Sequence, residues 1–456
     1  MTWLGTGRAP AQLFLIIGAL FSILWALITP PFQAPDENRH FCRAYQLSDG
    51  RLFAIKHENT MGDSLPVSVI ETMDRINPGM AFHSRDQRQD LDKVWHYLRL
   101  PLQAEEKAFY EFSASAIYPP PAYLPAIVAI WIGKTGNVSP LVMMYLGRFA
   151  HLALWLVVMV SALRLTPTGK WVMALIALMP MSIFLAGAVH QDGFINAFCF
   201  LLLACTLKFA HDPGVLSRPQ YGGLFLLTLV IAFSKPGFAL FAVVFLLLPA
   251  QKFASRRRQW MLWILMVLAA LAITWGWKSL AQQDLNWLEP WASYDKQSQA
   301  VVASPMLFIG AALRSFWVFK LFYIRSHVGQ LGWLDTLLPL PIIAVFLLLI
   351  AVAAVLNHEG SLSVRQRIVL ALVVSGVAGV TALALYLVNS PVGDAYVHGI
   401  SGRYFIPAAP FFWLLFQNHF VHRRVRPGRA WILAGVLGVV VSLAWASYIL
   451  IERYYL

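Results

Sequence analysis

The chain has 456 residues, of which 59% are hydrophobic and 12% are charged, and its formal net charge is +13. A soluble domain is about 45–50% apolar and roughly a quarter charged, so this composition excludes an ordinary soluble protein and indicates many membrane spans. Apolar runs recur from one end to the other, with no low-complexity tract and no long hydrophilic domain. We therefore expect a single integral membrane domain over residues 1–456.

The first apolar run, residues 12–29, is the first predicted span. Arg8 precedes it, but it ends in Thr29-Pro30-Pro31-Phe32 rather than in a small-x-small cleavage motif. We therefore interpret it as an uncleaved span and not as a signal peptide. Residues 30–120 follow as a large, charge-rich loop with interfacial helices, and residues 121–456 are expected to form the remaining helical bundle.

Together with the later apolar runs, this first span predicts an all-α integral membrane protein. We expect about 11 full spans and two partial or interfacial helices. The partial helices are 122–133, which is too short to cross, and 305–324, which Arg314 and Lys320 interrupt. The full spans are predicted near 12–29, 140–163, 171–188, 194–210, 221–235, 236–250, 260–280, 335–356, 366–389, 403–421 and 430–450.

The positions of the basic residues predict the orientation of the bundle. With the N-terminus inside and neither partial helix crossing, the inner loops hold 15 of the 35 Lys and Arg residues but only two of the 22 acids. The basic excess is thus an orientation signal, and nucleic acid is excluded as its cause; anionic lipids are the expected partners of these loops. The inner basic residues are Arg8, Arg164, Lys170, Lys208, Arg218, Lys252, Arg256, Arg257, Arg258, Arg365, Arg367, Arg423, Arg424, Arg426 and Arg429.

The polar sequence after the first span, Asp36-Glu37-Asn38-Arg39-His40, is the first candidate site. Pro35 is typical of a helix start, and a helix there would place Asp36, His40 and Arg43 on one face. The carboxylate could accept a proton or hold a metal, while His40 and Arg43 could neutralise a phosphate. The alternative is an interfacial helix whose acids complement its dipole and whose Arg reaches lipid headgroups.

Two further clusters lie in short turns on the same predicted outer side. Asp192, in His190-Gln191-Asp192, could act as a second carboxylate beside Asp36, or could simply cap the next helix. Lys235 separates two short apolar runs, where a cation needs an anionic partner. It could bind a phosphate, or it could reach headgroups from a plain hairpin.

The outer loop at 389–402 leads into Ser401-Gly402-Arg403-Tyr404, where Arg403 could grip a phosphate bidentately or anchor the chain at the membrane interface. The segments around Tyr118 and Trp333 could line a sugar site or could be turns. No Walker loop, nucleophile elbow, HExxH motif or dinucleotide fingerprint occurs, so ATP-driven transport and serine hydrolysis have no support. Cys42, Cys199 and Cys205 lack paired spacing, which indicates neither a disulfide framework nor a zinc site.

The order of these motifs resembles a family of bacterial polytopic membrane proteins that is catalogued as a domain of unknown function and looks related to the GT-C glycosyltransferases. The resemblance covers nearly the whole chain. The motifs that carry it are Pro35-Asp36-Glu37, His40-Phe41, Arg43-Ala44-Tyr45, Tyr118-Pro119-Pro120, Gly147-Arg148, Gln191-Asp192-Gly193, Lys235-Pro236, Gly332-Trp333-Leu334-Asp335 and Ser401-Gly402-Arg403-Tyr404-Phe405-Ile406-Pro407.

The resemblance implies a GT-C-like helical bundle that takes a sugar from a polyprenyl-phosphate donor on the outer face of the membrane. The catalytic acid of the first outer loop would be Asp36, with Glu37 beside it, and Asp192 would be a later assisting acid. The residues expected to bind substrate are His40, Arg43, Tyr118, Gln191, Lys235, Trp333, Asp335, Arg403 and Tyr404.

The expected function is therefore a membrane glycosyltransferase of the bacterial cytoplasmic membrane, with a cytoplasmic N-terminus, an envelope glycan or lipid acceptor and Asp36 as general base. No cofactor is required, although Asp36 and Asp192 could hold a divalent metal. One alternative is a carrier or flippase for lipid-linked saccharides, although the matched halves typical of transporters are not visible. Another is a non-catalytic subunit of envelope polysaccharide assembly.

Overall fold

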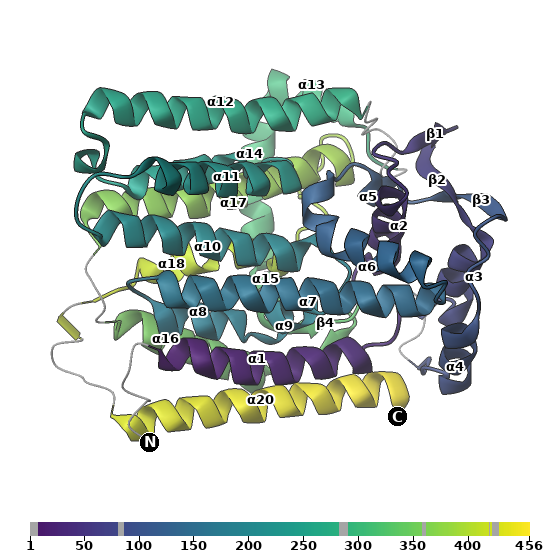
Figure 1. The fold of residues 1–456 in the computed structure, drawn as a ribbon. Coiled ribbons are helices and arrows are strands. Elements are labelled where there is room, and N and C mark those ends of the chain that lie inside the picture. Colours follow the sequence, from purple (N-terminus) through teal and green to yellow (C-terminus); the bar gives the residue numbers. More distant parts are fainter. Residues whose placement is uncertain (1–7, 81–85, 282–290, 358–361, 419, 422–427) are drawn as a thin grey trace.

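The computed structural model describes residues 8–80, 86–281, 291–357, 362–418, 420–421 and 428–456. The long helices run side by side as a bundle, and the elements of the 30–120 loop gather at one end of it (Figure 1). Three of the predicted inner basic residues, Arg423, Arg424 and Arg426, lie outside the described residues, as does part of the predicted outer segment 281–335.

Six helices of the described chain are long and apolar enough to cross a membrane, and a seventh candidate is a pair of helices bent by 105°. The molecule is thus a mostly helical membrane protein, as predicted. The six are α1 (Ala9–Ile28), α7 (Pro140–Leu165), α10 (Gln191–His211), α12 (Arg256–Leu280), α17 (Val364–Asn389) and α20 (Arg429–Tyr455), and the bent pair is α13 (Tyr294–Ala303) with α14 (Pro305–Val318).

The other five predicted spans are shorter or broken, so the expectation of about 11 full spans is only partly met. Residues 171–188 form two short helices, because the residue before a proline is disfavoured in the helical region and Met179, before Pro180, is extended. Residues 335–356 begin a helix only after Pro339. The short elements are α8 (Lys170–Ala177), α9 (Pro180–Ala186), α11 (Arg218–Ser234), α16 (Leu340–Val355), η6 (Gly402–Ala408) and α18 (Ala409–Leu414).

The run 236–250 is a special case, because its central part is the 3₁₀-helix η3 (Phe238–Leu247). A 3₁₀-helix rises about 2 Å per residue instead of 1.5 Å, so ten residues cover about 20 Å. η3 packs beside α11, α12 and α17 and is followed by η4 (Ala250–Phe253). A run too short for an α-helical crossing is thereby extended along the bundle.

The loop 30–120 is a small folded region with its own apolar core, into which Phe41, Leu65 and Phe112 are buried. Its three-stranded antiparallel sheet has the order β1-β2-β3. The predicted partial helix 122–133 is α6 (Leu124–Thr135), and 305–324 divides into α14 and α15 (Lys320–Val328). The loop elements are α2 (Glu37–Ser48), β1 (Ile55–His57), β2 (Thr60–Pro66), α3 (Val67–Ile76), α4 (Leu91–Arg99), β3 (Lys107–Glu111), α5 (Ser113–Ala116) and η2 (Pro120–Tyr123).

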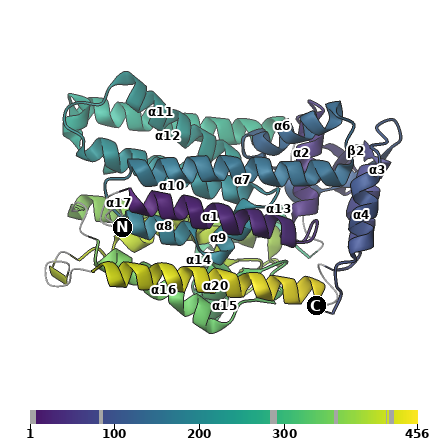
Figure 2. The same cartoon turned by 60° about the horizontal axis from the view of Figure 1, so that its bottom comes forward.

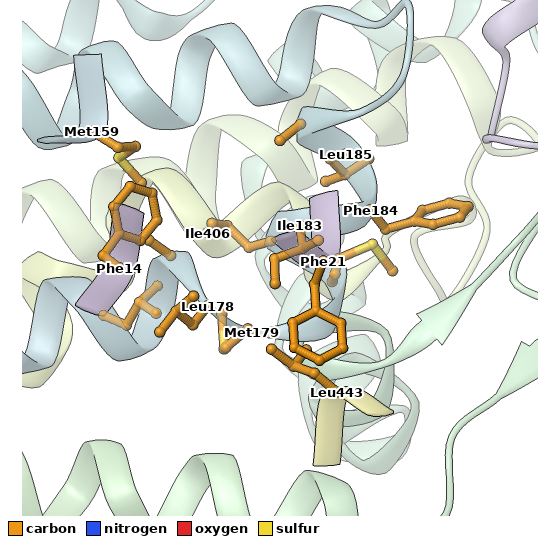
Figure 3. Close-up of a cluster of buried hydrophobic side chains, with 14 of the residues drawn as sticks. Phe14, Phe21, Met159, Leu178, Met179, Ile183, Phe184, Leu185, Ile406 and Leu443 are labelled. Atoms are coloured by element: carbon orange, nitrogen blue, oxygen red, sulfur yellow. The ribbon is translucent and has the colours of Figure 1, made fainter. Parts of the chain in front are cut away.

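The main core lies where α1, α7 and the broken α8/α9 segment meet α20 (Figure 3). Phe14 and Phe21 of α1 pack there with Met179 and Ile183, and Leu443 closes the cluster from α20. The two ends of α20 lie at opposite ends of the bundle (Figure 2). Near its C-terminus, α20 contacts the segment just before α4, where the Gln89 N–H donates to the Tyr454 carbonyl over 2.7 Å. The core thus holds α1, α7 and α20 together, and α20 runs from one end of the bundle to the end that carries the 30–120 region.

Candidate functional site

The candidate site begins at Asp36, the residue immediately before α2. Its backbone is left-handed, with φ of 60°, an uncommon conformation for a residue other than glycine. The preceding loop is braced by Trp333, whose indole N–H donates to the Phe32 carbonyl over 3.2 Å. Such local strain is typical of positions that the surrounding structure holds for a function.

Four charged side chains from four separate segments meet here. Asp36 Oδ2 accepts a hydrogen bond from Arg403 Nη2 over 3.3 Å, and Arg403 Nε lies 3.9 Å from Asp192 Oδ2. Asp192 Oδ1 in turn accepts from Lys235 Nζ over 3.1 Å. The row Asp36, Arg403, Asp192, Lys235 therefore alternates in charge and is neutral in sum.

Local sequence explains why these segments can come so close. A Cβ at Gly402, just before Arg403, would lie 1.9 Å from the Tyr323 carbonyl oxygen, so only glycine lets η6 approach α15 this closely. Ser326 Oγ accepts from the Gly402 N–H over 2.8 Å and fixes the contact. Gly193 similarly allows the start of α10 to lie against Leu185 of α9.

Asp36 and Arg403 differ sharply in exposure. The Asp36 side chain is 35% exposed, whereas that of Arg403 is 5% exposed. Among the described residues, Arg403 Nε and Nη1 have no hydrogen-bond partner, and neither does Asp192 Oδ2. Because a buried guanidinium without its hydrogen bonds is costly, Arg403 is suited to receive an anion that reaches the site beside Asp36.

Aromatic and imidazole rings form one wall of the site. His40 Nδ1 and the Tyr123 hydroxyl lie 2.6 Å apart, and the His40 ring contacts that of His190, with centroids 4.0 Å apart. Tyr118 also stacks against His40, with ring centroids 5.8 Å apart. Burial lowers the pKa of His40 to about 4, so the ring is neutral at pH 7 in the absence of a ligand, and its role at a phosphate stays a prediction.

Glu37, predicted beside Asp36 as a catalytic acid, faces the other way. Both its oxygens accept from Arg148, over 2.8 Å and 2.5 Å, and Oε1 also accepts from the Val189 N–H. Arg148 further donates to the carbonyls of Ala26, Thr29 and Pro30, and both side chains are buried. These contacts hold the end of α1 and the start of α2 against α7, which is a structural task.

Three other residues that were predicted to bind substrate make contacts with residues outside the charged row. Arg43 is buried within the outer region, where it donates to the carbonyls of Tyr118 and Leu52. Trp333 braces the loop before Asp36, and Asp335 pairs with Arg453 of α20 at 2.9 Å. Arg43 and Trp333 thus hold backbone carbonyls near the site, and Asp335 holds the end of α20.

Tyr404 and Gln191, also predicted, do lie at the site. The Tyr404 hydroxyl is 3.4 Å from Arg403 Nη2, and Lys235 Nζ lies 5.0 Å from the centre of the Tyr404 ring. Gln191 Oε1 is buried and has no hydrogen-bond partner among the described residues. The structure thus brings together Asp36, His40, Tyr118, Gln191, Asp192, Lys235, Arg403 and Tyr404.

Sequence reasoning assigned no role to Arg148, His190 and Tyr123, although the first two lie in motifs that it singled out. A signal existed for Arg148, because a lone charge within the apolar run 140–163 needs a counter-ion, and Glu37 supplies it. His190 stood within a motif already singled out, and its Nδ1 accepts from the Asp192 N–H over 3.0 Å. Tyr123 has no comparable sequence signal.

The residues at the site do not group as metal ligands. Of the described residues, no three His, Cys, Asp or Glu side chains lie together in a way that could hold a metal ion. Arg403, rather than a shared open space, lies between Asp36 and Asp192. A divalent metal therefore stays a prediction from the sequence.

Comparison with known proteins gives one match. Residues 19–412 fit the family model described as "Predicted membrane protein (DUF2142)", and this range includes every residue of the charged row. No curated protein and no solved structure matches the chain.

Proposed function

The chain belongs to the DUF2142 family of predicted membrane proteins, and from that premise we propose that it is a glycosyltransferase of GT-C type. In this proposal it moves a sugar from a polyprenyl-phosphate donor to a glycan or lipid acceptor. One observation carries the proposal: a partly exposed carboxylate, Asp36, lies 3.3 Å from the buried Arg403, two of whose nitrogens have no hydrogen-bond partner in the described structure.

Asp36 is the general base in this proposal. An acceptor hydroxyl attacks the anomeric carbon of the donor sugar and gives its proton to the Asp36 carboxylate. The bond between that carbon and the phosphate oxygen breaks with inversion, and the polyprenyl phosphate leaves with the electron pair. Asp36 suits the role because it is the most exposed acid of the row and its other oxygen is not tied to Arg403.

Arg403 and Lys235 stabilise the negative charge that grows on the departing phosphate. Preorganised cations in a site that excludes water lower a barrier most when they face developing charge. Asp192 acts as a positioning residue, because it contacts both Lys235 and Arg403 and is itself buried. Tyr404 and the neutral His40 would then provide surfaces for the sugar.

The outer face of the membrane is the proposed location of the reaction. The basic residues Arg8, Arg164 and Lys170 meet at the opposite end of the bundle from α2, where α11, α12, α17 and α20 also begin (Figure 1). Since basic loops favour the cytoplasmic side, Asp36 would face outward in the bacterial inner membrane.

The test is to incubate the purified protein with a panel of polyprenyl-phosphate sugars and candidate acceptors. Release of polyprenyl phosphate, coupled to a glycosylated acceptor, supports the proposal. Binding of a lipid-linked sugar without release, together with its movement across vesicle membranes, would instead support the carrier interpretation. If no member of the panel binds, the result supports the interpretation as a non-catalytic subunit of envelope polysaccharide assembly.

A further inference from the structure

A second positively charged site lies at the other end of the bundle from Asp36. Arg8, Gln12, Arg164 and Lys170 line a cavity of about 660 Å³. They come from three places in the sequence: the start of α1, the end of α7 and the start of α8. No carboxylate is among the described residues that line it.

The electrostatics of this cavity favour an anion. Three like charges around one space repel one another, and an anion placed between them relieves the repulsion. The starts of α1 and α8 add the positive ends of two helix dipoles, and neither first turn contains an acid. Lys170 and Arg164 are neighbours across the short turn between α7 and α8, so the chain itself holds two of the cations together.

The surface beside the cavity is apolar, which indicates that the ligand has an apolar part in addition to its anionic group. Counting from Gln12, the residues four, eight, eleven and fifteen positions on lie on the same face of α1. They are Ile16, Leu20, Ile23 and Leu27, and between 43% and 64% of each is exposed. On α7, Val157 lies two turns before Arg164 and is 64% exposed.

We propose that this cavity binds the phosphate headgroup of an anionic phospholipid, whose acyl chain lies along the exposed apolar stripe of α1. A free phosphate would use the cations but not the stripe, so the stripe favours a lipid. The site is at the far end of the bundle from the row of Asp36 and Arg403 and does not depend on the proposed transferase activity.

Native mass spectrometry of the delipidated protein in detergent tests the proposal directly. Phosphatidylglycerol and phosphatidylcholine with identical acyl chains are titrated separately, and inorganic phosphate is added as a competitor. The test variant is Arg8→Gln/Arg164→Gln/Lys170→Gln. The matched control is Arg256→Gln/Arg257→Gln/Arg258→Gln, which removes three exposed charges at the start of α12, outside the cavity.

The wild type and the control are expected to bind one phosphatidylglycerol at least tenfold more tightly than phosphatidylcholine. The test variant should lose that preference, because it removes the three cations that line the cavity, whereas the control leaves them in place. Equal preference in the test variant and the wild type would overturn the proposal, as would equal losses in test and control. Competition by inorganic phosphate at the concentration that binds lipid would also overturn it, in favour of a free-phosphate site. If the triple variant does not fold, Arg164→Gln alone should still weaken binding severalfold.

Discussion

Two adjacent carboxylates, Asp36 and Glu37, have opposite environments. Asp36 is 35% exposed at the charged row, while Glu37 is buried and saturated by Arg148 and the Val189 N–H. The sequence could locate the pair but not separate the two roles. The left-handed backbone at Asp36 has no unambiguous sequence signal.

The charged row itself was largely predictable, since Asp36, Asp192, Lys235 and Arg403 were each polar interruptions beside apolar runs. What could not be predicted was which of the surrounding polar residues line the site. Arg43, three residues after His40, satisfies carbonyls of the outer loop instead. The carbonyl oxygens that accept from Arg43 come close to it only when the loop is folded, so the sequence does not indicate this contact.

The buried His40 predicts how stability depends on pH. Its pKa falls from an ordinary 6.5 to about 4 on folding, so the unfolded chain binds a proton in the range where the folded chain does not. Stability is therefore lost as the pH falls from about 6.5 towards 4, by on the order of 3 kcal/mol for this one group.

Thermal unfolding in detergent between pH 7 and pH 4 should show a smaller decline for His40→Gln than for the wild type. His57→Gln, at an exposed position in β1, is the control and should retain the full decline. An unchanged slope in His40→Gln would show that His40 is not held neutral by the fold.

At the scale of elements, the Glu37–Arg148 pair joins α1, α2 and α7. Glu37→Gln leaves a buried guanidinium without its counter-ion, and we expect a loss of about 3–5 kcal/mol in unfolding free energy. Glu71→Gln is the comparison, because Glu71 pairs with the largely exposed Arg75 and should cost no more than about 1 kcal/mol. Denaturant unfolding followed by tryptophan fluorescence measures both.

The double variant Glu37→Gln/Arg148→Met adds a second check on that interpretation. Removing both charges should recover part of the stability lost in Glu37→Gln. A Glu37→Gln protein of wild-type stability but without transfer activity would instead give Glu37 a chemical role.

The long helices were predictable from apolar length alone, because a run near twenty residues has few alternatives in a membrane. Of the five remaining runs, three contain a proline at which the α-helix is broken or delayed. Pro180 breaks one, Pro339 delays another, and Pro407 lies inside η6. A hydropathy scale does not penalise these prolines within an apolar run. A proline nevertheless lacks a backbone N–H and disfavours a continuous α-helix.

At the scale of the whole molecule, the two ends of the bundle differ in charge and in predicted side. Lys107→Cys, in the outer sheet, should react with a membrane-impermeant maleimide in intact cells. Arg257→Cys, at the start of α12, should react only after the cells are permeabilised. The native Cys42 and Cys199 are buried and Cys205 is half-buried, so the unmodified protein provides the background. The reverse pattern would place the charged row in the cytoplasm.

The sugar-transfer rate of Asp36→Asn tests the central claim most directly. Asn tolerates the left-handed backbone of this position, so the variant should fold and still bind the donor. We predict a transfer rate at least about 100-fold below wild type, since a positioned general base contributes 10²–10⁴-fold, with near-normal activity in the exposed control Asp92→Asn. Full transfer activity in Asp36→Asn would contradict the account.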